Sequence, residues 1–477
     1  MDILLYNSAH REKELFIPLQ EGHVGMYTCG MTVYDYAHIG HGRKYVGDDI
    51  VRRVLEHAGY VVKHVQNVTD VGHLVSDEDE GEDKMEKGAL KHGKNVWDVA
   101  EYFTDHFYSS MDALGVLRPT IVCKATDHIP EQIALIETLV EKGFAYDTAE
   151  AVYFDIAKFP AYGSLFGGQN LDDKKIAVRE EVQTGSFKKN PADFALWFKR
   201  VGHFAQHTMH WPSPWGDGFP GWHIECSAMS MKYLGETFDI HTGGIDHISV
   251  HHPNEIAQSE AATGVPFARY WIHHNFLTVD GKKMSKSLGN YYTIEQVMER
   301  GYDPMTLRFL YMGAHYRQQL NFTWEALTAA QEGLAHMRLL VVKVLAGVAE
   351  GDGANDEKIE ESQKEFFAAL CDDFNTPRAV GILFSFLKEA AKDPAQYSSE
   401  AMRGYITACD AILGVGLEGG IAKSVEVIPE DIQALVIERD VMRARKEWLE
   451  ADRLRAHLES RGYTVEDTVH GTLAKKL

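Results

Sequence analysis

Cysteine is scarce in this chain, which has five cysteines among 477 residues. Their number is odd, and they are scattered through the sequence at Cys29, Cys123, Cys226, Cys371 and Cys409. This pattern excludes a disulfide framework and is typical of a reducing compartment. In such a compartment a cysteine is either a small core residue or a metal ligand or catalytic group.

Long apolar runs are missing as well. The most apolar one, residues 339–349, contains Lys343 and is much shorter than the roughly 18 to 20 residues that a membrane span needs. Residues 1–12 have neither a basic segment nor a small-residue cleavage site, so we predict no signal peptide. We expect a cytoplasmic protein with no membrane association.

Positive charge is in deficit, because 48 Lys and Arg stand against 70 Asp and Glu and give a formal net charge of −22. The overall field therefore repels nucleic acid, and any polyanionic partner must meet a local basic surface. One such surface is predicted in residues 431–461, a long amphipathic helix or a broken pair of helices that is rich in arginine.

The chain is organised around residues 27–41. A short buried strand is predicted over residues 24–27, Gly30 breaks it, and residues 47–57 have apolar positions at helical spacing. A helix that begins near His38, after a parallel strand, directs unpaired backbone N–H groups at a crevice where phosphate binds. His38 and His41 can add side-chain donors to that phosphate.

The order of predicted elements indicates a divided parallel sheet followed by helices. A second strand over 61–68 completes a strand, helix, strand unit, and helices are predicted over 95–114 and 130–143. The acid-dense residues 76–86 are best explained as a solvated loop that opens a helix, and the alternative is a metal or basic-partner site. A strand-rich stretch from about 151 to 220 fits an insertion between two halves of the sheet.

The second half of the sheet is predicted to resume with a strand over 238–244 and a helix from about Pro253. From Thr293 to the end the pattern is mostly helical. Two glycine-rich linkers, 346–356 and 414–420, interrupt it.

Four residues far apart in the sequence form a candidate metal site: Cys29, Cys226, His251 and Glu255. With the helix opening at Pro253, His251 stands just before it and Glu255 within it, so the two could face one point. Two thiolates, an imidazole and a carboxylate suit zinc. No CxxC pair supports this set, and for each residue taken singly a buried cysteine or a helix-capping histidine is favoured over a metal ligand.

The second notable segment is 280–290, where lysines and serines lie between Gly281 and Gly289. A mobile cationic loop of this kind is suited to grip polyphosphate while charge develops. When residues 280–290 are considered without the rest of the chain, the alternative to a phosphate-binding loop is a solvated basic turn. Its pairing with a His-Gly-His element more than 200 residues earlier favours the phosphate interpretation.

His38-Ile-Gly-His41 and Lys283-Met-Ser-Lys-Ser287 are similar to the two signature motifs of class I aminoacyl-tRNA synthetases. The segments around them resemble the cysteinyl-tRNA synthetase family along almost the whole chain: residues 29–36, 190–197, 220–226, 238–241, 251–259, 373–379, 451–455 and 465–468. The resemblance implies roles for individual residues. Zinc would be held by Cys29, Cys226, His251 and Glu255. ATP would be bound by His38, Gly40, His41, Gly243, Asp246 and Lys286, and substrate cysteine by Thr69, Trp222 and Asp246. The catalytic groups would be His38, His41, Lys283 and Lys286.

The same resemblance implies an ATP- and Mg²⁺-dependent enzyme that forms cysteinyl-AMP from L-cysteine, releases pyrophosphate and transfers cysteine to the 3′ end of tRNA(Cys). We expect it to act as a monomer. Zinc would select cysteine over serine, because a soft thiolate ligand is preferred to a hydroxyl and a hydrophobic pocket separates close isosteres weakly. The alternatives are a cysteine ligase with an amino-sugar acceptor and an inactive tRNA-binding paralogue. A small nucleotidyltransferase would explain the histidines alone but neither the second loop nor the length.

The predicted fold class is α/β, with a Rossmann-type parallel-sheet catalytic domain split by an insertion, an all-α helical bundle and a small C-terminal anticodon-binding region. The predicted boundaries are 1–115 and 221–282 for the two halves of the catalytic domain, 116–220 for the insertion, 283–345 for the lysine loop and stem-contact helices, 346–420 for the bundle and 421–477 for the C-terminal region.

Overall fold

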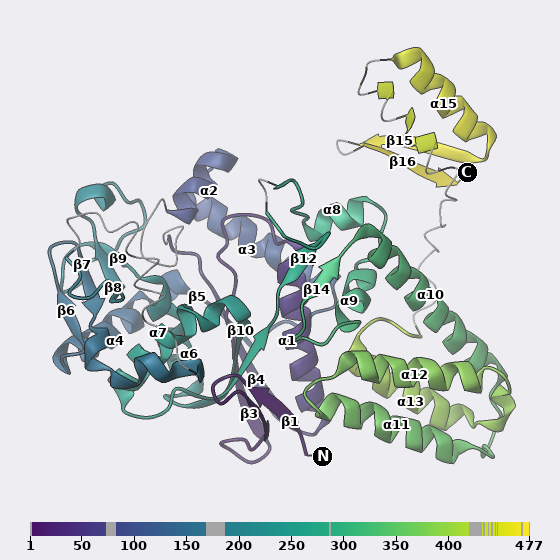
Figure 1. Cartoon of the computed structure of the whole chain (residues 1–477), viewed down its shortest axis with the longest axis horizontal. Coiled ribbons are helices and arrows are strands. Elements are labelled where there is room, and N and C mark those ends of the chain that lie inside the picture. The colour runs from purple at the N-terminus through teal and green to yellow at the C-terminus, as the bar shows by residue number, and fades with distance from the viewer. Residues whose placement is uncertain are drawn as a thin grey trace.

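The computed structural model describes residues 2–72, 83–167, 187–285, 288–418, 447–468 and 471–476, with single positions between 432 and 445. Its centre is a five-stranded, all-parallel sheet in the order β11-β10-β3-β4-β5 (Figure 1). The strands are β3 (His23–Thr28), β4 (Val61–Val68), β5 (Ile121–Lys124), β10 (Phe238–Gly244) and β11 (Ala268–His274). The strands predicted over 24–27, 61–68 and 238–244 are confirmed.

The strand order reverses at β3, because the chain goes from β3 to β4 on one side and returns to β10 on the other. Ligands of open parallel sheets bind in the crevice at such a reversal, beyond the carboxyl ends of the strands. The crossover after β3 is α1 (Ile39–His57), and α2 (Lys84–His92) and α3 (Val96–Ala113) follow β4. The predicted crossover helix and the helix over 95–114 are confirmed.

A four-stranded antiparallel sheet lies between β5 and β10 in the sequence. It has the order β6-β7-β8-β9, with strands Ala145–Asp147, Ala151–Phe154, Phe194–Lys199 and Gly218–Pro220. Its side chains share a core with α4 (Ile129–Glu141), α6 (Trp222–Leu234) and α7 (His251–Thr263). Figure 1 shows this sheet on one side of the central sheet and the helical bundle on the other.

A small sheet in the order β13-β12-β14 follows the central one, with strands Lys282–Lys283, Leu277–Val279 and Leu320–Phe322. The helices after it are α8 (Ile294–Glu299), α9 (Pro304–Met312), α10 (Trp324–Gly347), α11 (Asp356–Cys371), α12 (Thr376–Ala390) and α13 (Ser399–Leu413). The bundle shares one hydrophobic core with α1 and the central sheet, so it packs directly on the catalytic domain.

Short elements complete the chain. They are the hairpin β1 (Leu4–Asn7) and β2 (Glu12–Leu15), and the 3₁₀ helices η1 (Ala125–His128), η2 (Ile156–Lys158), η3 (Pro160–Gly167), η4 (Gly202–Phe204), η5 (Ile245–Ile248) and η7 (Pro394–Gln396). Along the ranges given above, no helix is long and apolar enough to span a membrane.

The C-terminal part corrects one prediction. Helix α15 (Trp448–Ser460) is followed by an antiparallel hairpin of β15 (Tyr463–Thr468) and β16 (Gly471–Lys476), where a mostly helical end was expected. Strand β14 was also missed, because it lies in the stretch after Thr293 that was predicted to be mostly helical. The positions described between 432 and 443 are helical, and Trp448 begins the separate helix α15. This agrees with the second of the two predictions for residues 431–461, a broken pair of helices. Residues 76–82 of the acidic segment 76–86 lie outside the described residues, and Asp83, the first described residue of the segment, caps α2.

Candidate active site

The beginning of α1 is built from the first histidine motif. The N–H of His41 donates to Nδ1 of His38 at 3.2 Å, and the N–H of His38 donates to Nδ1 of His41 at 3.3 Å. The two rings stack with centroids 3.5 Å apart. His38 is thus the N-cap of a helix that begins at Ile39, as the sequence predicted. Burial lowers the pKa of His41 well below 6.5, and His38 and Lys44 add to this effect, so the His41 ring is neutral at neutral pH.

Gly40 allows the two signature segments to meet. A Cβ at this position would lie 2.9 Å from Cε1 of the His38 ring and 3.3 Å from Cε of Met284, which belongs to the lysine loop. The N–H of Ile39 also donates to the carbonyl of Tyr292 at 3.0 Å. The start of α1 and the segment around the lysine loop are therefore in direct contact.

The lysine loop is held at both ends. Asp280 and Gly281 have φ of 51° and 71°, which fits a tight hairpin turn between β12 and β13. Asn290 closes the other end, because it accepts from the N–H of Ser285 at 2.8 Å and donates to the carbonyl of Lys283 at 3.2 Å. Lys283 is exposed on β13. Lys286 lies outside the described residues.

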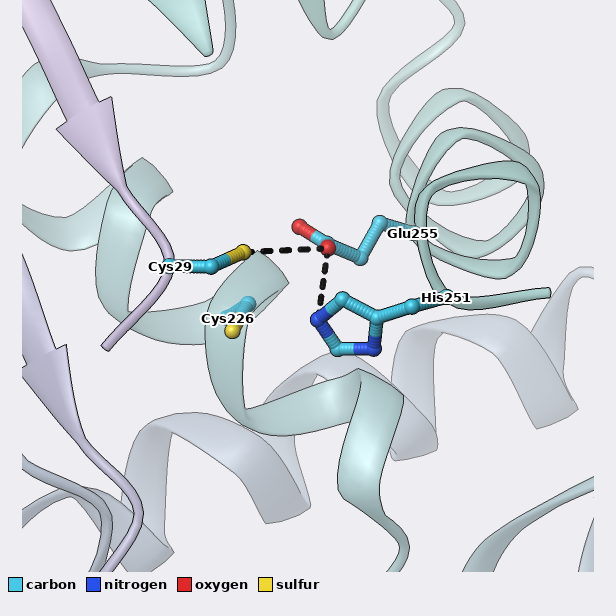
Figure 2. A group of neighbouring side chains, drawn as sticks. All are labelled: Cys29, Cys226, His251 and Glu255. Carbon is cyan, nitrogen blue, oxygen red and sulfur yellow. Dashed lines mark hydrogen bonds and ion pairs between the residues drawn. The ribbon is translucent and has the colours of Figure 1, made fainter. Parts of the chain in front are cut away.

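The candidate metal ligands come from three elements that meet beyond the end of β3. Cys29 directly follows β3, Cys226 lies in the second turn of α6, and His251 and Glu255 are one turn apart on α7. All four are buried, and their ligand atoms lie within 4.8 Å of one another. Figure 2 shows the four side chains converging on one point.

Helix α7 begins at His251, two residues earlier than predicted. Pro253 is therefore the third helical residue. It is still in the first turn, where its missing N–H would have no partner within the helix. The earlier start places His251 and Glu255 on the same face, with Nε2 of His251 2.9 Å from Oε1 of Glu255.

The electrostatics of this cluster suit a cation. A hydrogen bond with Cys29 lowers the pKa of Cys226 to about 6, although burial opposes the shift. Burial also opposes ionisation of Glu255, but His241 and His251 outweigh it and lower the pKa of Glu255 to about 2. Burial raises the pKa of Cys29 well above 9.0. A buried carboxylate and a thiolate thus converge beside a second thiol, which is a donor set that fits zinc.

A layer of buried histidines surrounds the cluster, and sequence reasoning missed it. His241 on β10 lies with Nε2 2.8 Å from the second carboxylate oxygen of Glu255. Nε2 of His252 lies 3.5 Å from Sγ of Cys29, and its Nδ1 lies 2.7 Å from Nε2 of His273. Cys29, His241, His252 and Glu255 form a second set of potential ligand atoms within 4.8 Å. The density of histidines between 241 and 252 was the available signal.

Residues predicted to bind the amino acid lie next to the cluster. Trp222, the first residue of α6, stacks on His251 with ring centroids 4.2 Å apart. Thr69 donates to Oε2 of Glu225 at 2.9 Å. Glu225 was not predicted, and burial raises its pKa well above 4.5. A glutamate next to Cys226 in the sequence was its only signal.

Gly243 and Asp246 lie at the carboxyl end of β10 and in η5. A Cβ at Gly243 would be 2.5 Å from the His252 ring, so glycine is needed there for the histidine layer to pack. The adjacent strands β10 and β3 end at the same edge of the sheet. The structure describes every predicted site residue except Lys286. The described ones lie around one edge of the sheet.

Three family matches cover most of the chain. They are the tRNA synthetases class I (C) catalytic domain over residues 15–332, the DALR domain over 365–418 and the cysteinyl-tRNA ligase anticodon binding domain over 426–472. A cysteine–tRNA ligase 1 of Burkholderia lata is 46% identical over 99% of this chain and 96% of its own length. The chain belongs to the cysteine–tRNA ligase family. Another member, from Treponema denticola, is 43% identical over the full length of both chains.

Solved structures of other class I synthetases share the fold. The methionyl-tRNA synthetase of Mycobacterium tuberculosis in complex with methionyl-adenylate has a TM-score of 0.59 at 15% identity, over 82% of this chain and 91% of that one. A leucyl enzyme of Agrobacterium radiobacter K84, in a ternary complex with tRNA, has a TM-score of 0.60 at 12% identity, over 84% and 85% of the two chains. The predicted fold class and family are therefore confirmed.

Proposed function

We propose that the chain activates L-cysteine with ATP to cysteinyl adenylate, releases pyrophosphate and transfers the cysteinyl group to the 3′-terminal ribose of tRNA(Cys). The observation that supports this most strongly is the buried cluster of Cys29, Cys226, His251 and Glu255. It lies at the same sheet edge as a helix start suited to bind phosphate, in a chain of the cysteine–tRNA ligase family.

ATP would bind over the start of α1. The backbone N–H groups there, with His38, Gly40 and His41, would orient the phosphates, and Gly243 and Asp246 would border the nucleotide. Lys283 and Lys286 would stabilise the charge that develops on the leaving pyrophosphate, whose Mg²⁺ arrives with ATP. Most of the catalysis is then positioning and electrostatic stabilisation, and no residue is assigned as a general base.

Zinc would be held by Cys29, Cys226, His251 and Glu255. When bound, it would supply a soft Lewis acid that prefers a thiolate to a hydroxyl and so favours cysteine over serine. His241 would position one of these metal ligands, because its Nε2 contacts the second carboxylate oxygen of Glu255. Thr69, Trp222 and Asp246 would border the amino acid, where the Trp222 ring covers His251.

The rival acceptor is an amino sugar, as in a cysteine ligase that does not use tRNA. The anticodon binding domain match over residues 426–472 favours tRNA, because a small acceptor needs no such region. The capped histidine pair and the four-residue cluster favour an active enzyme over an inactive paralogue. The cytoplasmic location, the monomeric state and the bounds of the six predicted regions stay predictions.

The test is cysteine-dependent exchange between ATP and pyrophosphate, followed by charging of bulk tRNA with labelled cysteine and with serine as the control. We expect both reactions with cysteine and neither with serine. Exchange without charging would favour the amino-sugar ligase. A protein that lacks exchange altogether would be the inactive paralogue.

A further inference from the structure

A buried arginine on α1 binds two separate segments of the backbone. Arg43 lies two residues after His41 and is 4% exposed. Burial lowers the pKa of Arg43 to about 10, so the group is still charged at neutral pH. Its Nη1 donates to the carbonyls of Asn275, at 3.1 Å, and Phe276. Its Nη2 donates to the carbonyls of His315, at 3.4 Å, and Gln318. One planar guanidinium therefore joins α1 to both segments.

These two segments lead directly into the strands that carry the lysine loop. Residues 275–276 precede β12, and residues 315–318 precede β14. The two strands pair with each other in parallel. β12 lies beside α1 and turns into β13, on which Lys283 lies (Figure 1). Arg43 therefore holds the small sheet to α1 at the start of both strands.

The helical bundle supports residues 315–318 through Asp373, in the turn between α11 and α12. Asp373 is fully buried. Its Oδ1 accepts from the hydroxyl of Tyr316 at 2.6 Å, and its Oδ2 accepts from Nε of Arg317 at 2.7 Å. Asp373 and Phe374 have φ of 63° and 53°, in the left-handed region that residues with side chains rarely adopt. Such conformations persist only where the surrounding structure fixes them, so this support is rigid.

Packing alone does not hold this segment against α1. A cavity lies between them, lined by Gly47 and Ile50 of α1 and by His274 and Tyr316. A cavity at an interface leaves out van der Waals contacts that would otherwise fix the distance between its two sides. The hydrogen bonds of Arg43 therefore carry much of the contact between α1 and the segment.

The position of the small sheet decides how the two signature motifs meet. Met284 in the lysine loop lies 3.3 Å from the place that a Cβ on Gly40 would take. Arg43 follows Gly40 on the same helix. A shift at the start of β12 or β14 would therefore move Lys283 relative to His38.

We propose that Arg43 is a positioning residue for the formation of the adenylate. Its guanidinium fixes the paired strands β12 and β14, and with them the lysine loop, relative to the helix that begins with the histidine motif. Because Arg43 acts through the backbone of other segments, its effect falls on the rate of the chemical step and not on the binding of cysteine or zinc. This inference rests on the proposed function and names a further residue that its first step needs.

The first test uses Arg43→Lys in the full-length protein. Lysine keeps the charge, but a single Nζ cannot reach both backbone segments. We expect kcat of cysteine-dependent pyrophosphate exchange to fall by about tenfold or more, because small displacements of positioning groups cost this much. The KM for cysteine and the zinc content should stay within about twofold of wild type. A residue that only stabilised the fold would not separate these quantities.

The matched control is Arg338→Lys on α10. Its guanidinium also donates to backbone carbonyls, those of Val415 and Gly416, but these residues follow α13 in the bundle. Its kcat and KM should stay within about twofold of wild type. The unfolding temperatures of both variants are measured alongside, so that a loss of stability is recognised.

The second variant is Asp373→Asn. It loses the charge that balances Arg317 but keeps an oxygen that can accept from Tyr316. It should lower kcat while the KM for cysteine stays unchanged. In the double variant Arg43→Lys/Asp373→Asn the combined loss should be smaller than the product of the two single losses, because both residues hold the same segment.

Normal kcat in Arg43→Lys would overturn the inference, as would an equal loss in Arg338→Lys or a loss of cysteine affinity and zinc together with the rate. If Arg43→Lys does not fold, Asp373→Asn decides, and normal exchange in that variant would overturn the inference. Losses that multiply in the double variant would contradict the shared segment. Absence of exchange in the wild type would instead overturn the proposed function, so the two failures are distinguishable.

Discussion

At the scale of single residues, Gly40 decides whether the start of α1 can form. Alanine is normally preferred to glycine within a helix by about 1 kcal/mol. Here the added Cβ would meet ring atoms of His38 at 2.9 and 3.0 Å and Met284 at 3.3 Å. The His38 ring would have to leave the cap, and the two signature segments would move apart.

We therefore predict that Gly40→Ala lowers the rate of pyrophosphate exchange by about tenfold or more, because small displacements of positioning groups cost this much. Its unfolding temperature should change little. Gly404→Ala on α13 is the matched control, since nothing lies within 4 Å of its added Cβ. It should keep full exchange and gain up to about 1 kcal/mol of stability. Normal exchange in Gly40→Ala would show that the cap geometry is not needed.

The residues of the site were predictable to different degrees. His38 and His41 could be interpreted from local sequence, because a capped helix after a strand is a local feature. Cys29 and Cys226 are almost 200 residues apart, so their donor chemistry gave only a weak indication of a shared site, and the resemblance strengthened it before the structure brought them together. His241 was missed because a histidine inside a buried strand has no local pattern. Its role depends on Glu255, which a different element supplies.

At the scale of elements, a buried ion pair joins α1 to α9. Arg308 is fully buried, and its Nη2 lies 2.5 Å from Oδ2 of Asp49. Its Nε also donates to the carbonyl of Leu413 at the end of α13. One guanidinium thus connects α1, the helix that the first histidine motif begins, with the helical bundle.

Removing one partner of a buried pair typically costs about 3–5 kcal/mol. Asp49 keeps a second partner, because Nε of Arg53 lies 2.7 Å from the same carboxylate oxygen, whereas the carbonyl of Leu413 loses its Arg308 donor. We therefore predict that Arg308→Met lowers the free energy of unfolding by about 3 kcal/mol, the lower end of that range, measured by urea denaturation. Arg403→Met is the control, because the Arg403–Glu418 pair is exposed and its atoms are 3.5 Å apart. That change should cost at most about 1 kcal/mol. A cost for Arg308→Met as small as that of the control would contradict the role of the pair.

Elements with clear limits in the sequence were predicted well, and short ones were not. β4 and β10 have the bounds that the sequence predicted, since β4 has valines at both ends and β10 ends in two glycines. β14 has only Leu320–Phe322 and exists through its pairing with β12, so its own sequence has too little pattern. The C-terminal hairpin likewise depends on pairing between its strands.

At the scale of the whole molecule, the sheet reversal and the bundle explain how distant motifs meet. The reversal at β3 opens the crevice, and the residues that follow β3 and β10 enter it from opposite sides. The small sheet that carries the lysine loop is joined to the bundle through β14 and α10. The net charge of −22 indicates that a polyanionic partner needs a local basic surface. It cannot place such a surface, because its position depends on which elements pack together.

The central claim is that the buried cluster holds zinc and thereby selects cysteine. It is tested most directly by measuring the zinc content of the purified protein together with its binding of L-cysteine and L-serine. We predict about one zinc per chain and strong preference for cysteine in the wild type, and loss of both in Cys226→Ser. Cys123→Ser, a buried cysteine outside the cluster, should retain both. A metal-free wild type that binds cysteine in preference to serine would contradict the claim.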